Sequence, residues 1–252
     1  MSARPARDLS LDKLEQIAQR LPVTEVRGSD GGPFRRLVSP RSGADCGETR
    51  VLVGGGPVRK VVYHAVVAEQ IGLDSHMIFA FTDAGSAIPH WTFDSVVAGG
   101  VHAFHLDLIP RADLGAHLAY LDAVYEPITE LHEAGRAHPG LTEPAIGPKQ
   151  RSVMSHWMLA YRVPGEQYRE IDPYVQGYLD HWIGLVEAGV DDEVVASLNG
   201  TDVAARDDAN RSMIFNRAVD PVWDMITPLV GLEQSELLRT DLLTNEVLTD
   251  VP

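Results

Sequence analysis

The sequence has 252 residues and a mass of 27.5 kDa, with 44% hydrophobic and 23% charged residues. These values are typical of one globular domain over residues 1–252 and exclude a disordered or collagen-like chain. The net charge of −15 argues against nucleic-acid binding, and the single cysteine, Cys46, excludes an intramolecular disulfide and a cysteine-based metal cluster.

The first third of the chain mixes helical, strand-like and glycine-rich patterns. Apolar residues recur at helical spacing after Leu9, whereas residues 28–50 are rich in Gly, Ser, Pro and charge. Pro57 follows three glycines at a position that the first turn of a helix tolerates. The glycines lack the spacing of a phosphate-binding loop, so they predict a tight turn. We expect loops at 1–8 and 28–50 with a short strand at 34–38, helices at 9–21 and 58–71, and a strand at 50–53.

The centre of the chain is rich in β-forming residues. Three runs bounded by turn residues predict strands. Gly99-Gly100, between the last two, favours a two-residue hairpin turn, because such turns need positive φ angles. The three expected strands are 75–82, 90–97 and 101–108.

From Asp113 onward the pattern is helical. Asp172-Pro173 and Asp220-Pro221 are typical of helix starts. An antiparallel sheet followed by helices indicates an α+β protein, an α/β/α sandwich with a central antiparallel sheet flanked by helices. The expected helices are 113–125, 152–161, 171–188, 191–198, 203–218 and 222–229.

The diglycine turn fixes which residues face each other across the hairpin. Asp94 should lie opposite His105, and Thr92 opposite Asp107. Strand alternation then places His90 on the same face as these four. The other face should be an apolar platform made of Trp91, Phe93, Phe104, Leu106 and Leu108.

The polar face of this hairpin allows several functional interpretations. Paired Cβ atoms lie about 5 Å apart, so Asp94 and His105 can share a hydrogen bond that raises the imidazole pKa, as a proton donor requires. A solvated sheet face and a structural His–Asp pair are simpler alternatives. A metal site of His90, Asp94, His105 and Asp107 is chemically feasible, although the spacing follows no known ligand motif. Ser155-His156 and Cys46 lack evident partners, so we do not expect nucleophilic hydrolysis.

The segment Pro89–Glu126 carries a family resemblance. Its distinctive parts are Pro89-His90-Trp91, an acid at 94, the run from Leu106 to Arg111, and Tyr120. These resemble red chlorophyll catabolite reductase and, more distantly, the ferredoxin-dependent bilin reductases. Arg206-Asp207 and Asp220-Pro221, with Met225 and Gly231, are similar to the C-terminal pattern of that superfamily.

The resemblance implies an open-chain tetrapyrrole bound between the sheet and the C-terminal helices. It implies no tightly bound cofactor or metal, ferredoxin as the external donor of single electrons, and side-chain acids as the proton source. Where the chlorophyll-catabolite enzyme has a glutamate, this chain has Asp94, and the C-terminal acid falls on Asp220. A non-catalytic tetrapyrrole or hydrophobic-ligand carrier is the alternative. The candidate catalytic residues are Asp94, His105 and Asp220, and the candidate substrate-binding residues are His90, Thr92, Asp107 and Arg211.

Location and partners follow from charge and composition. No apolar run approaches the roughly 18 residues of a membrane span, and MSARPARDLS lacks the apolar segment of a secretory signal. With one cysteine, we expect a cytoplasmic protein; a homodimer is compatible with the sequence. Residues 1–60 hold 11 Lys and Arg against 7 Asp and Glu, so a basic surface there could bind acidic ferredoxin.

Overall fold

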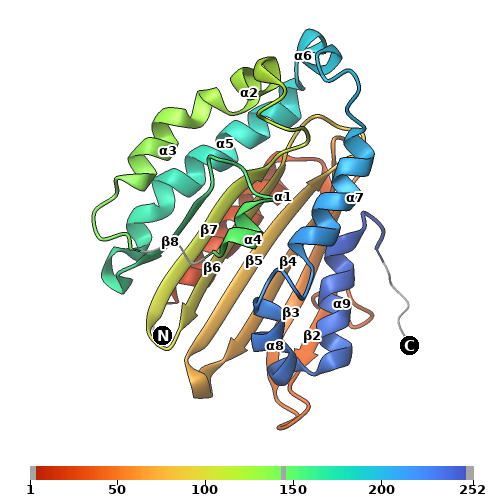
Figure 1. Cartoon of the computed structure of the whole chain (residues 1–252). Coiled ribbons are helices and arrows are strands. Elements are labelled where there is room, and N and C mark those ends of the chain that lie inside the picture. Colours follow the sequence, from red (N-terminus) through yellow and green to blue (C-terminus); the bar gives the residue numbers. More distant parts are fainter. Residues whose placement is uncertain (1–3, 143–145, 248–252) are drawn as a thin grey trace.

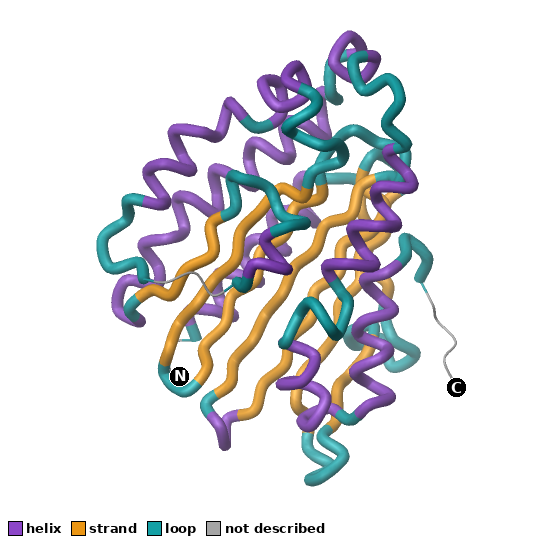
Figure 2. Tube along the Cα trace, viewed as in Figure 1, coloured by secondary structure: helices purple, strands orange, loops and turns teal. Residues whose placement is uncertain are grey.

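The computed structural model describes residues 4–142 and 146–247. These residues form one antiparallel sheet of eight strands with helices on both faces (Figures 1 and 2). In the view of Figure 1, α4, α7, α8 and α9 lie in front of the sheet and α1 lies behind it. The predicted α/β/α sandwich is therefore confirmed.

The strands and helices alternate unevenly along the chain. The strands are β1 (Val23–Val26), β2 (Arg35–Val38), β3 (Asp45–Gly54), β4 (Val58–Ala68), β5 (Leu73–Thr82), β6 (His90–Ala98), β7 (Val101–Ile109) and β8 (Leu159–Val163). The α-helices are α1 (Pro5–Arg20), α2 (Leu118–Val124), α3 (Thr129–Arg136), α4 (Pro148–Arg151), α5 (Asp172–Ala188), α6 (Asp192–Ala196), α7 (Val203–Ile214), α8 (Val222–Val230) and α9 (Leu232–Leu243). Three 3₁₀ turns lie at Glu69–Ile71, Glu126–Ile128 and Gly165–Ile171.

The sheet is mostly a meander. Its order is β1-β3-β4-β5-β6-β7-β8, and β2 pairs with β3 beside β1. From β3 to β7 each strand pairs with the next in sequence, so short turns fix the register. The β6–β7 turn has the predicted form, because Gly99 and Gly100 have φ angles of 56° and 82°.

Each face of the sheet has its own hydrophobic core. One core, against α1, α2 and α5, contains the predicted apolar platform of the hairpin, including the fully buried Trp91 and Phe93. The other lies between the sheet and the C-terminal helices and contains Phe79, Phe215 and Trp223. We call this second side of the sheet the α7–α9 face. The polar residues of the hairpin lie on it, as the alternation predicts.

The helix predicted over residues 58–71 is wrong. These residues form β4, which pairs with β3 and β5. Nearly every side chain of β4 is buried because helices cover both faces of the sheet at this point. A strand buried on both faces is a continuous apolar run, and periodicity cannot distinguish that from a buried helix. The glycines before Pro57 make the predicted tight turn, but it joins two strands.

Three other expectations need correction. Residues 28–50 are not all loop, because β3 begins at Asp45, and residues 1–8 are not all loop, because α1 begins at Pro5. Residues 152–161 do not form a helix: turns follow α4, and β8 then pairs with β7. The pairing partner of β8 lies far away in the sequence, so no local pattern reports it. Within the described residues, no helix is long and apolar enough to cross a membrane.

Candidate active site

The hairpin brings an aspartate and a histidine together on the α7–α9 face. Asp94 pairs with His105 in the register that the sequence predicts, and His105 Nδ1 lies 3.1 Å from Asp94 Oδ2. Within the described part of the chain, His105 Nε2 and Asp94 Oδ1 are buried without a hydrogen-bond partner. Each side chain of the pair thus keeps one polar atom available to a ligand.

Carboxylates surround His105 and change its protonation. Burial alone would lower the pKa of this imidazole, but the hydrogen bond to Asp94 and the negative charges nearby raise the pKa above its ordinary value. The charges belong to Asp94, Asp107 and Asp220. His105 can therefore hold a proton near neutral pH.

Asp220 reaches the same cluster from the segment between α7 and α8. Its Oδ1 accepts hydrogen bonds from Val222 N (3.0 Å) and from Gln150 Nε2 (3.1 Å). Burial, together with the charge of Asp94, raises the pKa of Asp220 to about 6, although His105 and these donors oppose the shift. The structure thus brings the three candidate catalytic residues together.

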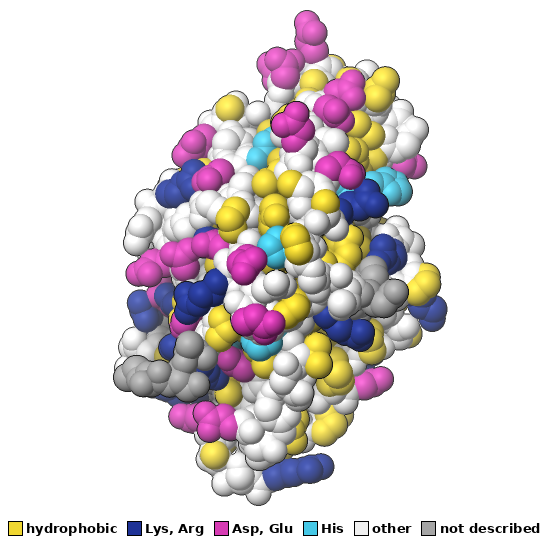
Figure 3. Space-filling view, turned by 90° about the vertical axis from the view of Figure 1, so that its left-hand side faces the viewer, with side chains coloured by type: hydrophobic (Ala, Val, Ile, Leu, Met, Phe, Trp, Pro, Cys, Tyr) yellow, Lys and Arg dark blue, Asp and Glu magenta, His cyan; other side chains and the backbone are white. Residues whose placement is uncertain are grey.

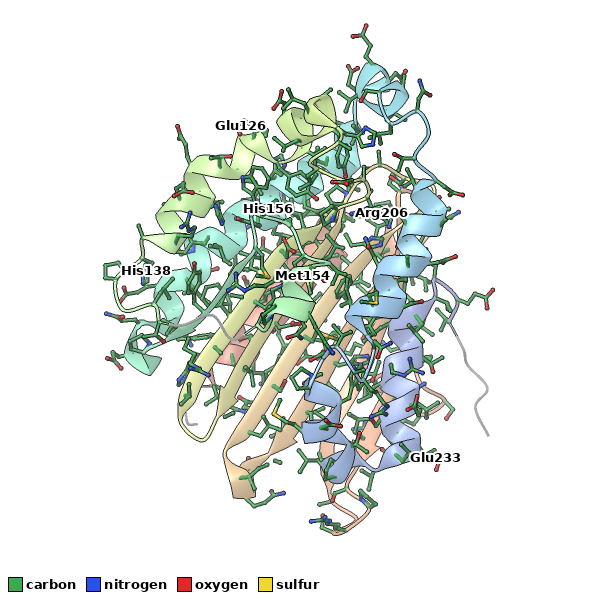
Figure 4. All side chains as sticks on the ribbon, in the orientation of Figure 1. Glu126, His138, Met154, His156, Arg206 and Glu233 are labelled. Carbon is green, nitrogen blue, oxygen red and sulfur yellow. The ribbon has the colours of Figure 1, made fainter. Side chains whose placement is uncertain are left out.

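Asp107 lies beside them but is fully engaged with the protein. Ser155 donates to it twice, from N to Oδ2 (2.9 Å) and from Oγ to Oδ1 (2.5 Å), and Leu108 N also donates to Oδ1 (2.8 Å). Burial raises the pKa of Asp107 to about 6. Asp107 therefore fixes the segment after α4 on the sheet. Met154 and His156, labelled in Figure 4, belong to that segment in front of the sheet.

A single row of side chains crosses the sheet at the level of the Asp94–His105 pair. The register places Thr49, His64, Met77, Asp94 and His105 side by side on five consecutive strands. At the far end, the Thr49 hydroxyl lies 2.9 Å from His64 Nδ1, and His64 Nε2 lies 3.1 Å from the Leu238 carbonyl oxygen. Burial lowers the pKa of His64 to about 4, so it is neutral at pH 7.

A small cavity of about 60 Å³, partly open to solvent, lies above the His64 and Met77 part of this row. Its floor comes from β4 and β5, its roof from α8 and α9, and Asp220 lies in its wall. Most of the lining is apolar. The lining residues are His64, Val66, Ser75, Met77, Phe215, Asp220, Val222, Trp223, Ile226 and Leu238.

Two predicted substrate-binding residues, His90 and Arg211, lie instead in a buried ionic cluster. His90 Nδ1 accepts from Thr82 N (3.0 Å), so Nε2 carries the proton and donates to Asp207 Oδ1 (2.5 Å). Arg111 and Arg211 also donate to Asp207, at 2.6 and 3.1 Å. The fourth predicted residue of this class, Thr92, donates its hydroxyl to the Ile78 carbonyl (3.2 Å). Direct substrate contact by these residues stays a prediction.

The metal alternative finds no support in the geometry. In residues 4–142 and 146–247, no three His, Cys, Asp or Glu side chains are grouped as metal ligands. His90 is bound to Asp207, away from the Asp94–His105 pair, so the four residues suggested for a metal do not converge.

The positive charge of the N-terminal third is largely paired within the molecule. Eight of its 11 cationic residues form ion pairs with Asp or Glu, and Lys13 is buried while doing so. Figure 3 shows acidic side chains gathered at the upper end of the molecule, with Lys and Arg in small scattered groups. The charge count along the sequence therefore overstates the basic surface.

The sequence analysis missed several residues of the site. Gln150 and Ser155 bind Asp220 and Asp107 from 70 and 48 residues away, so no local motif marks them. Met77 follows the alternation of a correctly predicted strand and could have been found by extending the register. His64 lies in β4, where the helix prediction hid it.

The comparisons with known proteins identify a solved structure with a similar fold. No protein-family model matches the chain, and no curated protein is detectably similar to it in sequence. Among solved structures, it is similar to phytochromobilin synthase from tomato, solved in complex with biliverdin. The TM-score is 0.70 at 13% identity, over 96% of this chain and 85% of the tomato protein. The two proteins therefore share a fold.

Proposed function

We propose that this protein is an oxidoreductase that reduces an open-chain tetrapyrrole, with electrons from ferredoxin and protons from Asp94, His105 and Asp220. One observation carries the proposal: an apolar cavity on the α7–α9 face has this acid cluster at its edge, in a fold shared with a protein solved with biliverdin bound. The same fold at low identity can host other functions, so the site carries the argument.

The cavity suits a conjugated ligand. Its walls combine apolar and aromatic side chains with few polar groups, which is the usual lining of a ligand pocket. Of its polar lining residues, Asp220 lies close to Asp94 and His105. A pyrrole ring system can therefore pack on Met77 and Trp223 while one region of it faces the acids.

Reduction of one carbon–carbon double bond requires two electrons and two protons. Each electron added to a tetrapyrrole makes it more basic, so an acid must stand close to the carbon that is protonated. With a pKa of about 6, Asp220 is protonated in about one molecule in ten at pH 7, and His105 has a raised pKa as well. Both shifts favour the protonated form of these groups near neutral pH, which a general acid needs.

The electrons must come from outside the chain, and we assign them to ferredoxin on the strength of the family resemblance. A docking surface in residues 1–60 is part of this proposal, although most of its cations are already paired. If that surface is used, raising the salt concentration should weaken turnover by screening it. Turnover that does not respond to salt would place the docking surface elsewhere.

Asp94 bears on which kind of tetrapyrrole the protein reduces. Asp94 is one methylene shorter than the glutamate of the red chlorophyll catabolite reductases, which leaves room for a different ring or substituent at that point. We propose that the substrate is a chlorophyll-derived tetrapyrrole, as in the red chlorophyll catabolite reductases. Haem-derived bilins are the alternative substrates against which this preference is tested. Asp94→Glu should shift the preference between the two, measured as a ratio of kcat/KM values.

A visible-absorbance screen tests the function. Purified protein is titrated with open-chain tetrapyrroles of both origins, and a bound ligand should shift the absorption bands. Reduced ferredoxin is then added without oxygen, and an enzyme should bleach the bound pigment. A shift without bleaching would identify a carrier instead, and no shift with either class would refute the proposal.

A further inference from the structure

The short helix α4 contributes one side chain to the candidate active site. Gln150 Nε2 donates to Asp220 Oδ1 at 3.1 Å, and Val222 N donates to the same oxygen at 3.0 Å. Within the described residues, both donors thus reach Oδ1 and none reaches Oδ2. The two oxygens of this carboxyl group are therefore not equivalent.

The difference in hydrogen bonding between the two oxygens determines which of them carries the proton of Asp220. An oxygen that accepts two N–H donors has both lone pairs occupied, so it cannot also carry a hydrogen. In the acid form of Asp220 the proton must then be on Oδ2.

Asp220 lines one space, and the adjacent Val219 and Pro221 line a second space of different character. The first is the apolar cavity, with Asp94 of β6 and His105 of β7 close to the carboxyl group. The second is an open groove whose charged residues are Lys149 of α4, Arg217 before α8 and Asp224 of α8. Without a fixed partner, the carboxyl group could turn its protonated oxygen toward the groove.

We propose that Gln150 is a positioning residue that anchors Asp220 Oδ1 and so directs the proton on Oδ2 toward the cavity. The proposal rests on the proposed function, in which Asp220 supplies a proton. It assigns Gln150 no contact with the reacting atoms, because the glutamine acts through Asp220.

Two substitutions at one position test this role. Gln150→Leu removes the donor at nearly unchanged size, whereas Gln150→Lys keeps a donor and adds a positive charge. Carboxyl-carbon NMR of ligand-free protein reports the titration of Asp220. We expect its midpoint to rise by about 0.5–1 pH unit with leucine and to fall with lysine, because hydrogen bonds and positive charge favour the ionised form. Midpoints that stay unchanged, or that move the same way in both variants, would overturn the proposal.

The matched control lies on the other side of the sheet. Gln176 of α5 donates to Asp180 Oδ1, also at 3.1 Å. Gln176→Leu therefore breaks a similar hydrogen bond, and it should leave the Asp220 titration unchanged. A shift as large as that of Gln150→Leu would refute a specific role for Gln150.

Kinetics give a second measurement once a substrate is known. For Gln150→Leu, kcat should fall about tenfold with KM changed less than twofold, since misdirected proton delivery affects the chemical step. A higher KM with unchanged kcat would overturn the positioning role. The NMR titration needs no substrate, so a wrong proposed function would leave its result standing.

Discussion

Two histidine–aspartate pairs lie on the same face of the sheet and differ in almost every physical property. His105 and Asp94 are 3.1 Å apart beside the cavity, and each keeps a polar atom without a partner. His90 and Asp207 are 2.5 Å apart and have every polar atom engaged. The first pair is available for chemistry, and the second holds α7 to the sheet.

The difference shows that surroundings, more than residue type, decide what such a pair does. Burial and the charge of Arg111 lower the pKa of His90 to about 3, so this imidazole stays neutral. Burial would raise the pKa of Asp207, but the hydrogen bond from His90 and the two arginines hold it well below its usual range. Near His105 the carboxylates outnumber the cations, and the pKa of the imidazole rises instead.

The largest expected effect is on stability. Asp207→Asn leaves Arg111 and Arg211 buried without their counter-charge, so unfolding free energy should fall by about 3–5 kcal/mol. Asp94→Asn should cost less than about 1 kcal/mol, because the Asp94 side chain is 38% exposed. Urea unfolding followed by circular dichroism measures both, and equal losses would contradict the distinction between the pairs.

The second effect is on turnover. With a confirmed tetrapyrrole substrate, Asp94→Asn and His105→Gln should each lower kcat by about a hundredfold, the usual contribution of a general acid. The control is Asp74→Asn, which breaks another His–Asp contact, with His76, on the α1 side of the sheet (2.8 Å). Unchanged turnover in both site variants would refute the proton-donor assignment.

The third effect is the pH dependence of stability. The contributions of His90 and His105 to the stability should change with pH in opposite directions. The lowered pKa of His90 adds stability above pH 6.5, which is lost as pH falls toward 3. The destabilisation by His90→Gln should therefore shrink by up to about 1.4 kcal/mol per pH unit of acidification.

The raised pKa of His105 adds stability that is complete below pH 6.5 and is lost as pH rises through the higher native value. His105→Gln should thus destabilise most in acid. Unfolding at pH 5, 6, 7 and 8 measures both trends, and trends of the same sign would contradict the assigned protonation states.

The smallest effect is a shift in titration. Imidazole NMR of the ligand-free protein should show His105 titrating above the ordinary histidine value, whereas His90 stays neutral from pH 5 to 9. Replacing Asp94 with asparagine should lower the His105 midpoint and leave His90 unchanged. A titration of His90 in this range would mean that Asp207 and the arginines do not control it.

The sequence allowed one of the two pairs to be found. Asp94 and His105 are 11 residues apart across a two-residue turn, so strand alternation and turn geometry were enough to pair them. His90 and Asp207 are 117 residues apart, and no periodicity links them. His90 was therefore grouped with the hairpin site, although its partner lies on α7.

By itself, the sequence determined the fold class, the central hairpin with its register, and which face of that hairpin is polar, because these depend on local turn geometry and a period of two residues. Only the tertiary structure decided that residues 58–71 form a central strand, that Gln150 and Ser155 hold the carboxylates, and that the N-terminal cations are mostly paired. Those features depend on contacts between distant segments and on burial from both sides, which no local pattern encodes.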